Sequence, residues 1–214
     1  MLLLFTLGFH ADHVLRRLMM VGNEDVERIL IVTAKPVVRA VRQAFHEIAS
    51  LCDRMYLPTP QLLELPIDDP GTSVAFLYRE IKDRSHIVAD LSGGMRPVVV
   101  VTLLALLLAT GRSYVELYVS GEREDAPVAR IPLNIFNYVL TKNMSEEKLE
   151  ILDIVWKVPG LSKHDLAQYL NKSDRTIRAH LSELKRYELI EDRGSKGLHP
   201  TTWTKLVLDI FKQG

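Results

Sequence analysis

Continuous apolar runs alternate with amphipathic stretches over the first two-thirds of the 214-residue chain. Such runs predict strands that are buried on both faces of a sheet, and the clearest lie at 2–7, 28–33 and 86–92. The intervening stretches space their apolar positions as helices do. This alternation of strand and helix predicts an α/β fold, with a Rossmann-like and mostly parallel sheet.

Shorter patterns predict the remaining elements of this first part. A weaker strand is expected at 55–57 or 62–67, and Pro36 is expected to begin a helix, because proline favours the first helical turn. Two further strands are expected at 113–120 and 128–133, and helices at 11–20, 36–51, 72–83 and 96–110.

Beyond residue 136 the pattern becomes helical, with one short hairpin. A helix is expected at 145–157, followed by two short capped helices, a hairpin around the turn 192–197 and a closing amphipathic helix. Ser162 with Asp165 forms a capping-box pattern. We therefore predict a first domain at 1–136, a linker at 137–144 and a small winged helix-turn-helix domain at 145–214.

Composition narrows the classes of function without choosing one. Lys plus Arg and Asp plus Glu both number 27, so net charge gives no argument for a nucleic-acid partner, although a local basic face is still possible. The single cysteine, Cys52, excludes an intramolecular disulfide framework and a four-cysteine zinc site. The longest apolar run, 98–109, is too short to span a bilayer, so we expect a cytoplasmic protein without membrane contact.

Two strand-to-helix turns carry the candidate chemistry of the first domain. If the strand at 86–92 is fourth in the sheet, these turns line one crevice beside the first strand. In the second turn, Gly93 and Gly94 allow close approach of a ligand to backbone N–H groups at a helix N-terminus, a favourable place for phosphate. Ser92 adds a hydroxyl group and Arg96 a cation. In the first turn, Gly8 allows close approach, and Phe9 or His10 could stack on a base.

Other site classes lack their motifs. The sequence contains neither G-x-G-x-x-G nor G-x-x-x-x-G-K-[ST], which argues against a dinucleotide site and excludes a P-loop. His10 and His13 have no evident third metal ligand. We therefore assign no metal, no cofactor and no catalytic residue.

The second domain presents a basic helix face and a basic hairpin. Arg175, Arg178 and Lys185 recur at helical spacing opposite an apolar stripe, which is typical of a helix that enters the major groove. Arg193 and Lys196 at the hairpin tip suit phosphate contacts. The predicted DNA-binding residues are Ser173, Arg175, Thr176, Arg178, Ser182, Lys185, Arg193 and Lys196. Winged helices that bind proteins are the main alternative.

These motifs support a family comparison. The segment LAQYLNKSDRTIRAHLSELKRYELIEDRGSKG resembles the winged helix-turn-helix of prokaryotic transcription regulators. TLGFH after the first strand and DLSGGMRP after a later one resemble the turns of a CRISPR-associated Rossmann-fold (CARF) domain. In this order, the two domains resemble archaeal CRISPR-associated transcription regulators of the Csa family.

The resemblance implies a homodimer joined through CARF domains, with cyclic oligoadenylate, foremost cyclic tetra-adenylate, bound across the dimer axis. It implies regulation of CRISPR-Cas genes through a palindromic or pseudo-palindromic promoter site. By position, the implied ligand residues are Thr6, Leu7, Gly8, Phe9, His10, Ser92, Gly93, Gly94, Met95, Arg96 and Pro97. A ring nuclease with an attached DNA-binding domain, and a regulator that senses another nucleotide, remain open alternatives.

Overall fold

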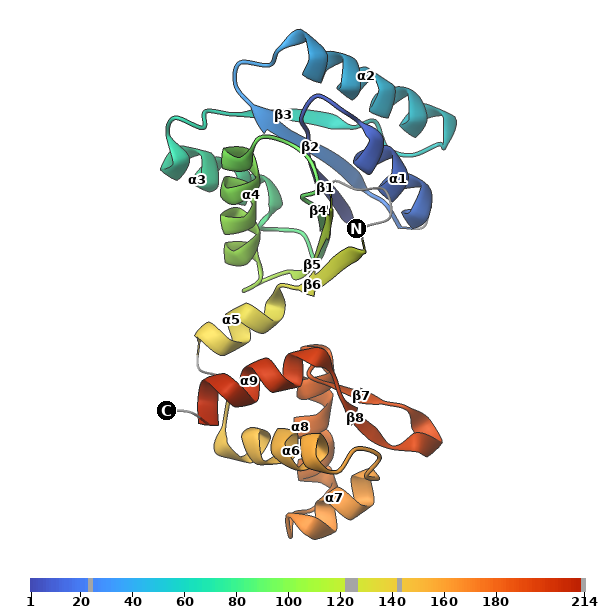
Figure 1. Cartoon of the computed structure of the whole chain (residues 1–214), viewed down its shortest axis with the longest axis vertical. Helices are drawn as coiled ribbons and strands as arrows, with labels where there is room; N and C mark the ends of the chain where they lie inside the picture. The colour runs from blue at the N-terminus through green and yellow to red at the C-terminus, as the bar shows by residue number, and fades with distance from the viewer. Residues whose placement is uncertain (23–24, 122–126, 142–143, 213–214) are drawn as a thin grey trace. The chain divides into compact units, whose positions relative to one another are not determined.

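The computed structural model describes residues 1–22, 25–121, 127–141 and 144–212. The chain divides into two compact units, Met1–Asn134 and Ile135–Gly214, and each is described by itself (Figure 1).

The first unit is built on a single mixed sheet. Within its described residues, six strands lie in the order β3-β2-β1-β4-β5-β6. The first five strands in that order are parallel, and β6 pairs antiparallel with β5. The bounds are Leu2–Thr6 for β1, Arg28–Ala34 for β2, Gln61–Leu65 for β3, His86–Asp90 for β4, Tyr114–Ser120 for β5 and Val128–Pro132 for β6. The predicted Rossmann-like, mostly parallel sheet is confirmed.

The strand order reverses at β1, which lies between β2 and β4. The register pairs Leu4 with Leu30 on one side and with Ala89 on the other. All five residues of β1 are buried, as its continuous apolar run predicts. The turns after β1 and β4 therefore meet at the edge where ligands bind in open α/β sheets.

Helices cover both faces of this sheet. Helices α1 (Asp12–Val21) and α2 (Arg39–Arg54) lie on one face, and α3 (Pro70–Ile81) and α4 (Arg96–Ala109) lie on the other (Figure 1). Helix α2 begins at Arg39, later than the predicted start at Pro36. Lys35 N–H still donates to Leu65 O at 2.9 Å, and Val38 is extended, with φ −84° and ψ 161°, so the helix begins only at Arg39.

The second unit has the predicted winged-helix order of elements. Its elements are α5 (Asn134–Leu140), α6 (Glu146–Lys157), α7 (Lys163–Tyr169), α8 (Asp174–Arg186), β7 (Ile190–Asp192), the 3₁₀ turn Gly194–Lys196, β8 (Leu198–Pro200) and α9 (Thr202–Lys212). Ser145, Ser162 and Ser173 cap α6, α7 and α8 as predicted, and Ser162 with Asp165 forms a full capping box.

The structure differs from the predicted linker at 137–144. Residues 137–140 belong to helix α5, whereas 142–143 lie outside the described residues. Ile135 and Tyr138, three residues apart on one helix face, are fully buried in the core of the second unit. The Tyr138 ring stacks on Tyr187 with 4.2 Å between centroids. The division between the units therefore falls directly after Asn134, the first residue of α5, and not at the end of that helix.

No helix in the described part of the chain is long and apolar enough to cross a membrane.

Candidate functional site

A cavity of about 670 Å³ lies beside the turns that follow β1 and β4. Eight of the eleven predicted ligand residues line it: Leu7, Gly8, Phe9, His10, Ser92, Gly93, Gly94 and Met95. Its volume falls within the ordinary range of small-molecule pockets, about 300–1,000 Å³. Thr6, Arg96 and Pro97 do not line the cavity.

The two turns pack directly against each other. A Cβ atom added to Gly8 would lie 3.2 Å from the backbone nitrogen of Gly94. Gly94 has a φ of +92°, and a Cβ there would lie 3.2 Å from Cβ of Thr6. Glycine is therefore required at these positions by the contact between the turns, before any ligand is considered.

Thr6 holds the second turn in place. Its side chain is fully buried, and its hydroxyl donates to the Gly93 carbonyl oxygen at 2.5 Å. The imidazole of His13 donates from Nε2 to the Thr6 carbonyl oxygen at 3.0 Å and lies against Gly93. Thr6 thus shapes the turn and does not line the cavity, while its predicted contact with a ligand stays a prediction.

Backbone N–H groups are available at the second turn. Among the described residues, the N–H groups of Gly93, Gly94 and Met95 donate to no protein acceptor. Met95 is also the N-cap of α4, whose first-turn N–H groups have no intrahelical acceptor. N–H groups at such a position suit an anion.

The cation beside the cavity differs from the predicted one. Arg96 and Pro97 are exposed and lie outside the cavity lining. Arg16, on α1, lines the cavity together with His13 and Asp12. Arg96 begins α4 outside this lining, and its predicted contact with phosphate stays a prediction.

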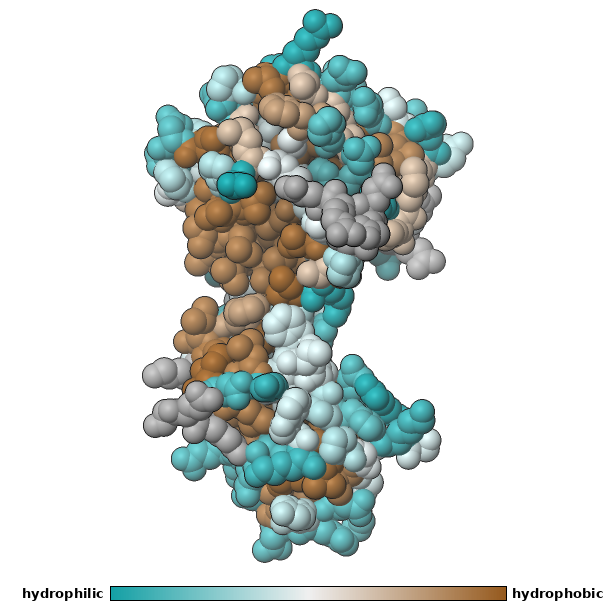
Figure 2. All heavy atoms as spheres, viewed as in Figure 1, coloured by the Kyte–Doolittle hydropathy of each residue, from teal (hydrophilic) through white to brown (hydrophobic). Residues whose placement is uncertain are grey.

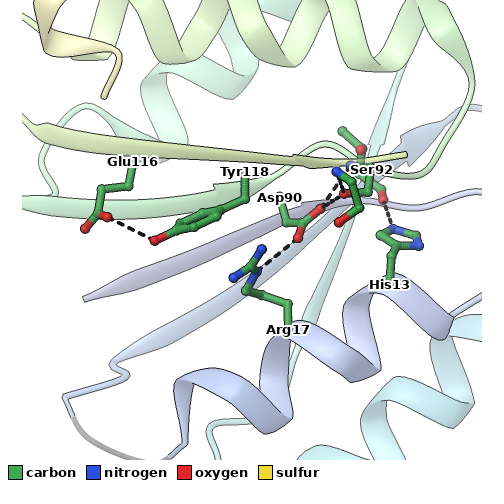
Figure 3. Close-up of polar contacts among 8 residues, drawn as sticks. His13, Arg17, Asp90, Ser92, Glu116 and Tyr118 are labelled. Atoms are coloured by element: carbon green, nitrogen blue, oxygen red, sulfur yellow. Dashed lines mark hydrogen bonds and ion pairs between the residues drawn. The ribbon is translucent and has the colours of Figure 1, made fainter. Parts of the chain in front are cut away.

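A buried polar network supports the second turn from behind (Figure 3). Asp90, at the end of β4, is 2% exposed, and its carboxylate accepts the N–H and hydroxyl of Ser92. The Ser92 oxygen also accepts the N–H of Ser120, at 2.8 Å. The Ser92 hydroxyl proton is therefore donated to Asp90 in this structure, and the predicted contact of Ser92 with a ligand stays a prediction.

Arg17 completes this network from α1. Its Nε lies 3.1 Å from Oδ2 of Asp90, and its guanidinium lies over the Tyr118 ring, 3.9 Å from the centroid. Sequence reasoning missed Arg17 and Asp90. Two features pointed to them: Arg17 follows His13 by four residues, on the same helix face, and Asp90 directly precedes the Leu-Ser-Gly-Gly turn.

A substitution pair separates Arg16 from Arg96. Arg16→Ala is expected to weaken binding of an anionic ligand by about tenfold, the effect of losing one charge-assisted contact. Arg96→Ala is expected to change affinity by less than about threefold, because its side chain lies outside the cavity. Isothermal titration with cyclic tetra-adenylate measures both values. The reverse order of the two losses would identify Arg96, and not Arg16, as the ligand-facing cation.

Several of the predicted DNA-binding residues are exposed in the second unit. Arg175, Arg178 and Ser182 are exposed on α8, opposite the buried stripe of Ile177, Leu181 and Leu184. Ser173 caps the helix by accepting the N–H of Thr176 at 3.2 Å, so its hydroxyl has a structural role. Arg178 borders a groove formed by α7, α8 and the hairpin.

Ion pairs occupy part of the predicted basic surface. Asp192 in the hairpin accepts from Lys163 at 2.7 Å and from Lys185 at 2.6 Å. These two lysines hold the pKa of Asp192 well below its usual value. Arg193 pairs with Glu191 at 3.0 Å. Among the described residues, Arg175, Arg178 and Lys196 make no ion pair.

The fold and the two surfaces define a class of protein. A Rossmann-like unit with a cavity where its strand order reverses precedes a winged helix-turn-helix with an exposed basic helix face. The model of the Csa3 CRISPR-associated Rossmann-like domain matches residues 1–131, and the chain belongs to this family.

A relative extends the similarity beyond that domain. The chain is 26% identical over 190 residues to a Csa3 protein of Saccharolobus solfataricus, covering 88% of this chain and 79% of the relative. The name of that protein describes it as related to a CRISPR locus and proposes that it binds DNA.

Solved structures give more distant matches. One is Can2 from Sulfobacillus thermosulfidooxidans with cyclic tetra-adenylate: 9% identity, TM-score 0.37, 99% of this chain and 65% of that chain. Another is the S. aureus MepR–DNA complex: 20% identity, TM-score 0.31, 37% of this chain and 62% of that chain. Both TM-scores are below 0.5, so nothing about ligand or partner follows from them.

Proposed function

We propose that the chain is a ligand-responsive, homodimeric transcription regulator of CRISPR-Cas genes. Its Rossmann-like unit binds a cyclic oligoadenylate, foremost cyclic tetra-adenylate, and its winged helix binds promoter DNA. The observation that carries the ligand proposal is the cavity at the sheet reversal, where unpartnered N–H groups of Gly93, Gly94 and Met95 adjoin Arg16. A phosphate fits this combination of amides and a cation.

An exposed apolar stripe supports the homodimer. Val100, Leu104 and Leu108 recur every four residues along α4 and are 54%, 46% and 58% exposed. Figure 2 shows the brown surface that gathers over this helix. Such a stripe is costly to leave in water, and a second copy can cover it by a self-complementary two-fold contact. Helix α4 begins at the cavity, so the two-fold axis would bring two cavities toward one symmetric ligand.

The winged helix supports the DNA partner. Arg175 and Arg178 are exposed near the start of α8, the part of a recognition helix that meets base edges. The Csa3 relative from Saccharolobus solfataricus, with its name proposing DNA binding, covers both units of this chain. A dimer would place two such helices on a palindromic or pseudo-palindromic site.

The proposal assigns binding, and no catalytic step, to the cavity. Of the two side chains that could assist phosphodiester cleavage, Ser92 donates its hydroxyl to Asp90, whereas His10 lines the cavity, so the assignment calls for a direct test. Prolonged incubation with cyclic tetra-adenylate tests this assignment. Linear adenylates formed over many turnovers would replace it with the ring-nuclease alternative.

The central experiment measures operator affinity with and without cyclic tetra-adenylate at fixed salt, on a duplex selected by the protein from a random pool. We expect the ligand to change affinity by about 5- to 150-fold, the usual range of coupling between two sites. Sedimentation velocity in the same buffers reports the dimer. Tight ligand binding with unchanged operator affinity would contradict a ligand-responsive regulator.

A further inference from the structure

A buried negative charge lies directly behind the proposed anion site. Asp90 is 2% exposed, and one hydrogen bond separates its carboxylate from Ser92, which lines the cavity. A carboxylate at this depth repels a phosphate through the wall of the cavity, because the protein interior screens charge poorly. An anion site of this geometry therefore needs a cation that compensates the charge of Asp90.

Arg17 supplies that compensation. Its guanidinium contacts Oδ2 of Asp90 at 3.1 Å, its side chain is 11% exposed, and it does not line the cavity. The Tyr118 ring fixes its other side, with the guanidinium 3.9 Å from the centroid. Figure 3 shows Arg17 reaching from α1 to Asp90 under the sheet, with Ser92 beyond it.

Arg16 and Asp12 line the cavity itself, and the charged groups around Tyr118 are paired with one another. The Tyr118 hydroxyl donates to Glu116 at 3.1 Å, and Glu116 also pairs with Arg130 at 2.8 Å and with His86 at 3.0 Å. His13 donates to a backbone carbonyl. Among the described residues, Arg17 is therefore the cation in ion-pair contact with Asp90.

We propose that Arg17 is a positioning residue for anion binding. It neutralises Asp90, so that the carboxylate can fix the Ser92 turn through two hydrogen bonds without repelling the phosphate. The inference rests on the proposed function, since it concerns the same cavity. The inference adds that the net charge behind the Ser92 turn depends on Arg17, a residue that does not line the cavity.

The test removes the charge of Arg17, of Asp90 or of both, with substitutions that keep the side chains close to their original size. Arg17→Met leaves Asp90 unpaired, and binding of cyclic tetra-adenylate is expected to weaken by at least about tenfold. Asp90→Asn keeps an oxygen that accepts from Ser92, and affinity is expected to equal or exceed that of the wild type. The double variant Arg17→Met/Asp90→Asn is expected to recover affinity to within about threefold of the wild type.

This recovery is the result that a purely structural role would not give. If Arg17 only packs α1 against the sheet, the double variant binds as weakly as Arg17→Met, and the proposal is overturned. Arg28→Met is the matched control: it removes the Arg28–Glu80 ion pair, 2.8 Å, in the same unit but away from the cavity. Its ligand affinity is expected to stay unchanged. Melting curves without ligand confirm that each variant is folded.

Titrations with two different anions distinguish a failure of this proposal from a failure of the proposed function. Each protein is titrated with cyclic tetra-adenylate and, in parallel, with inorganic diphosphate. The wild-type chain could bind only diphosphate, with the variants ranked by affinity as expected above. That result would overturn the proposal of a cyclic oligoadenylate ligand and support the role of Arg17. Binding of cyclic tetra-adenylate without recovery in the double variant overturns the role of Arg17 alone. A wild-type chain that binds neither anion overturns both.

Discussion

Replacement of Arg178 by alanine is expected to weaken operator binding by about 10- to 100-fold for each half-site, the value of one Arg contact to a guanine edge. Arg178 is exposed on α8, makes no ion pair among the described residues and borders the groove next to the hairpin. A dimer loses the contact twice, so the total effect exceeds that of one half-site. Affinity for cyclic tetra-adenylate is expected to stay unchanged, because Arg178 lies in the other unit.

Arg193→Ala is the control for this substitution. It also removes an arginine from the second unit, but Arg193 is paired with Glu191 at 3.0 Å and has less of its charge available to phosphate. Its expected loss is below about threefold. Fluorescence anisotropy with one labelled operator at fixed salt measures both variants. Equal losses would show that the hairpin contributes as much as α8, and an unchanged Arg178→Ala would show that α8 is not the recognition helix.

The substitution Gly94→Ala is expected to abolish ligand binding and to lower the free energy of unfolding of the first unit by about 1–3 kcal/mol. Two costs combine at this residue. Its φ of +92° is unfavourable for alanine, and the added Cβ would lie 3.2 Å from Cβ of Thr6 and 3.4 Å from the Leu7 nitrogen. The turn after β4 must then shift away from the turn after β1, which moves the cavity amides.

Gly22→Ala separates strain from packing in this experiment. Gly22 also has a positive φ, +69°, but among the described residues, its chain neighbours aside, no atom lies within 4 Å of the position that its Cβ would take. It is expected to lose stability through backbone strain and to keep ligand affinity. Thermal melting and calorimetric titration of both variants distinguish the cases. Intact ligand binding by Gly94→Ala would show that the contact between the turns does not shape the ligand site.

Much of the fold was predictable because buried parallel strands leave a simple pattern. The runs at 2–7, 28–33 and 86–92 lack polar alternation, as strands covered on both faces must, and each became a strand of the sheet. The capped helices of the second unit were equally predictable, because Ser162 and Ser173 act through local hydrogen bonds within three residues.

The candidate site was only partly predictable, because long-range contacts decide which side chains face the cavity. The turn sequences located the cavity, but the pairing of Arg17 with Asp90 joins residues 73 positions apart. Likewise, the helical spacing placed Lys185 on the basic face without showing that Asp192 of the hairpin engages it. Periodicity assigns a residue to a face, and only the packed structure shows its partner.

The junction between the two units determines where the second unit can be cut and joined to another domain. Asn134 bonds within the first unit, accepting the Val115 N–H at 2.7 Å and donating to the Ser113 carbonyl at 2.7 Å, whereas its neighbour Ile135 is fully buried in the second. A winged-helix unit fused to a different N-terminal domain would therefore have to begin at Ile135, so that it includes Tyr138. A cut at Ser145 would leave part of its core behind. The match to the family model ends at residue 131, just before this division between the units.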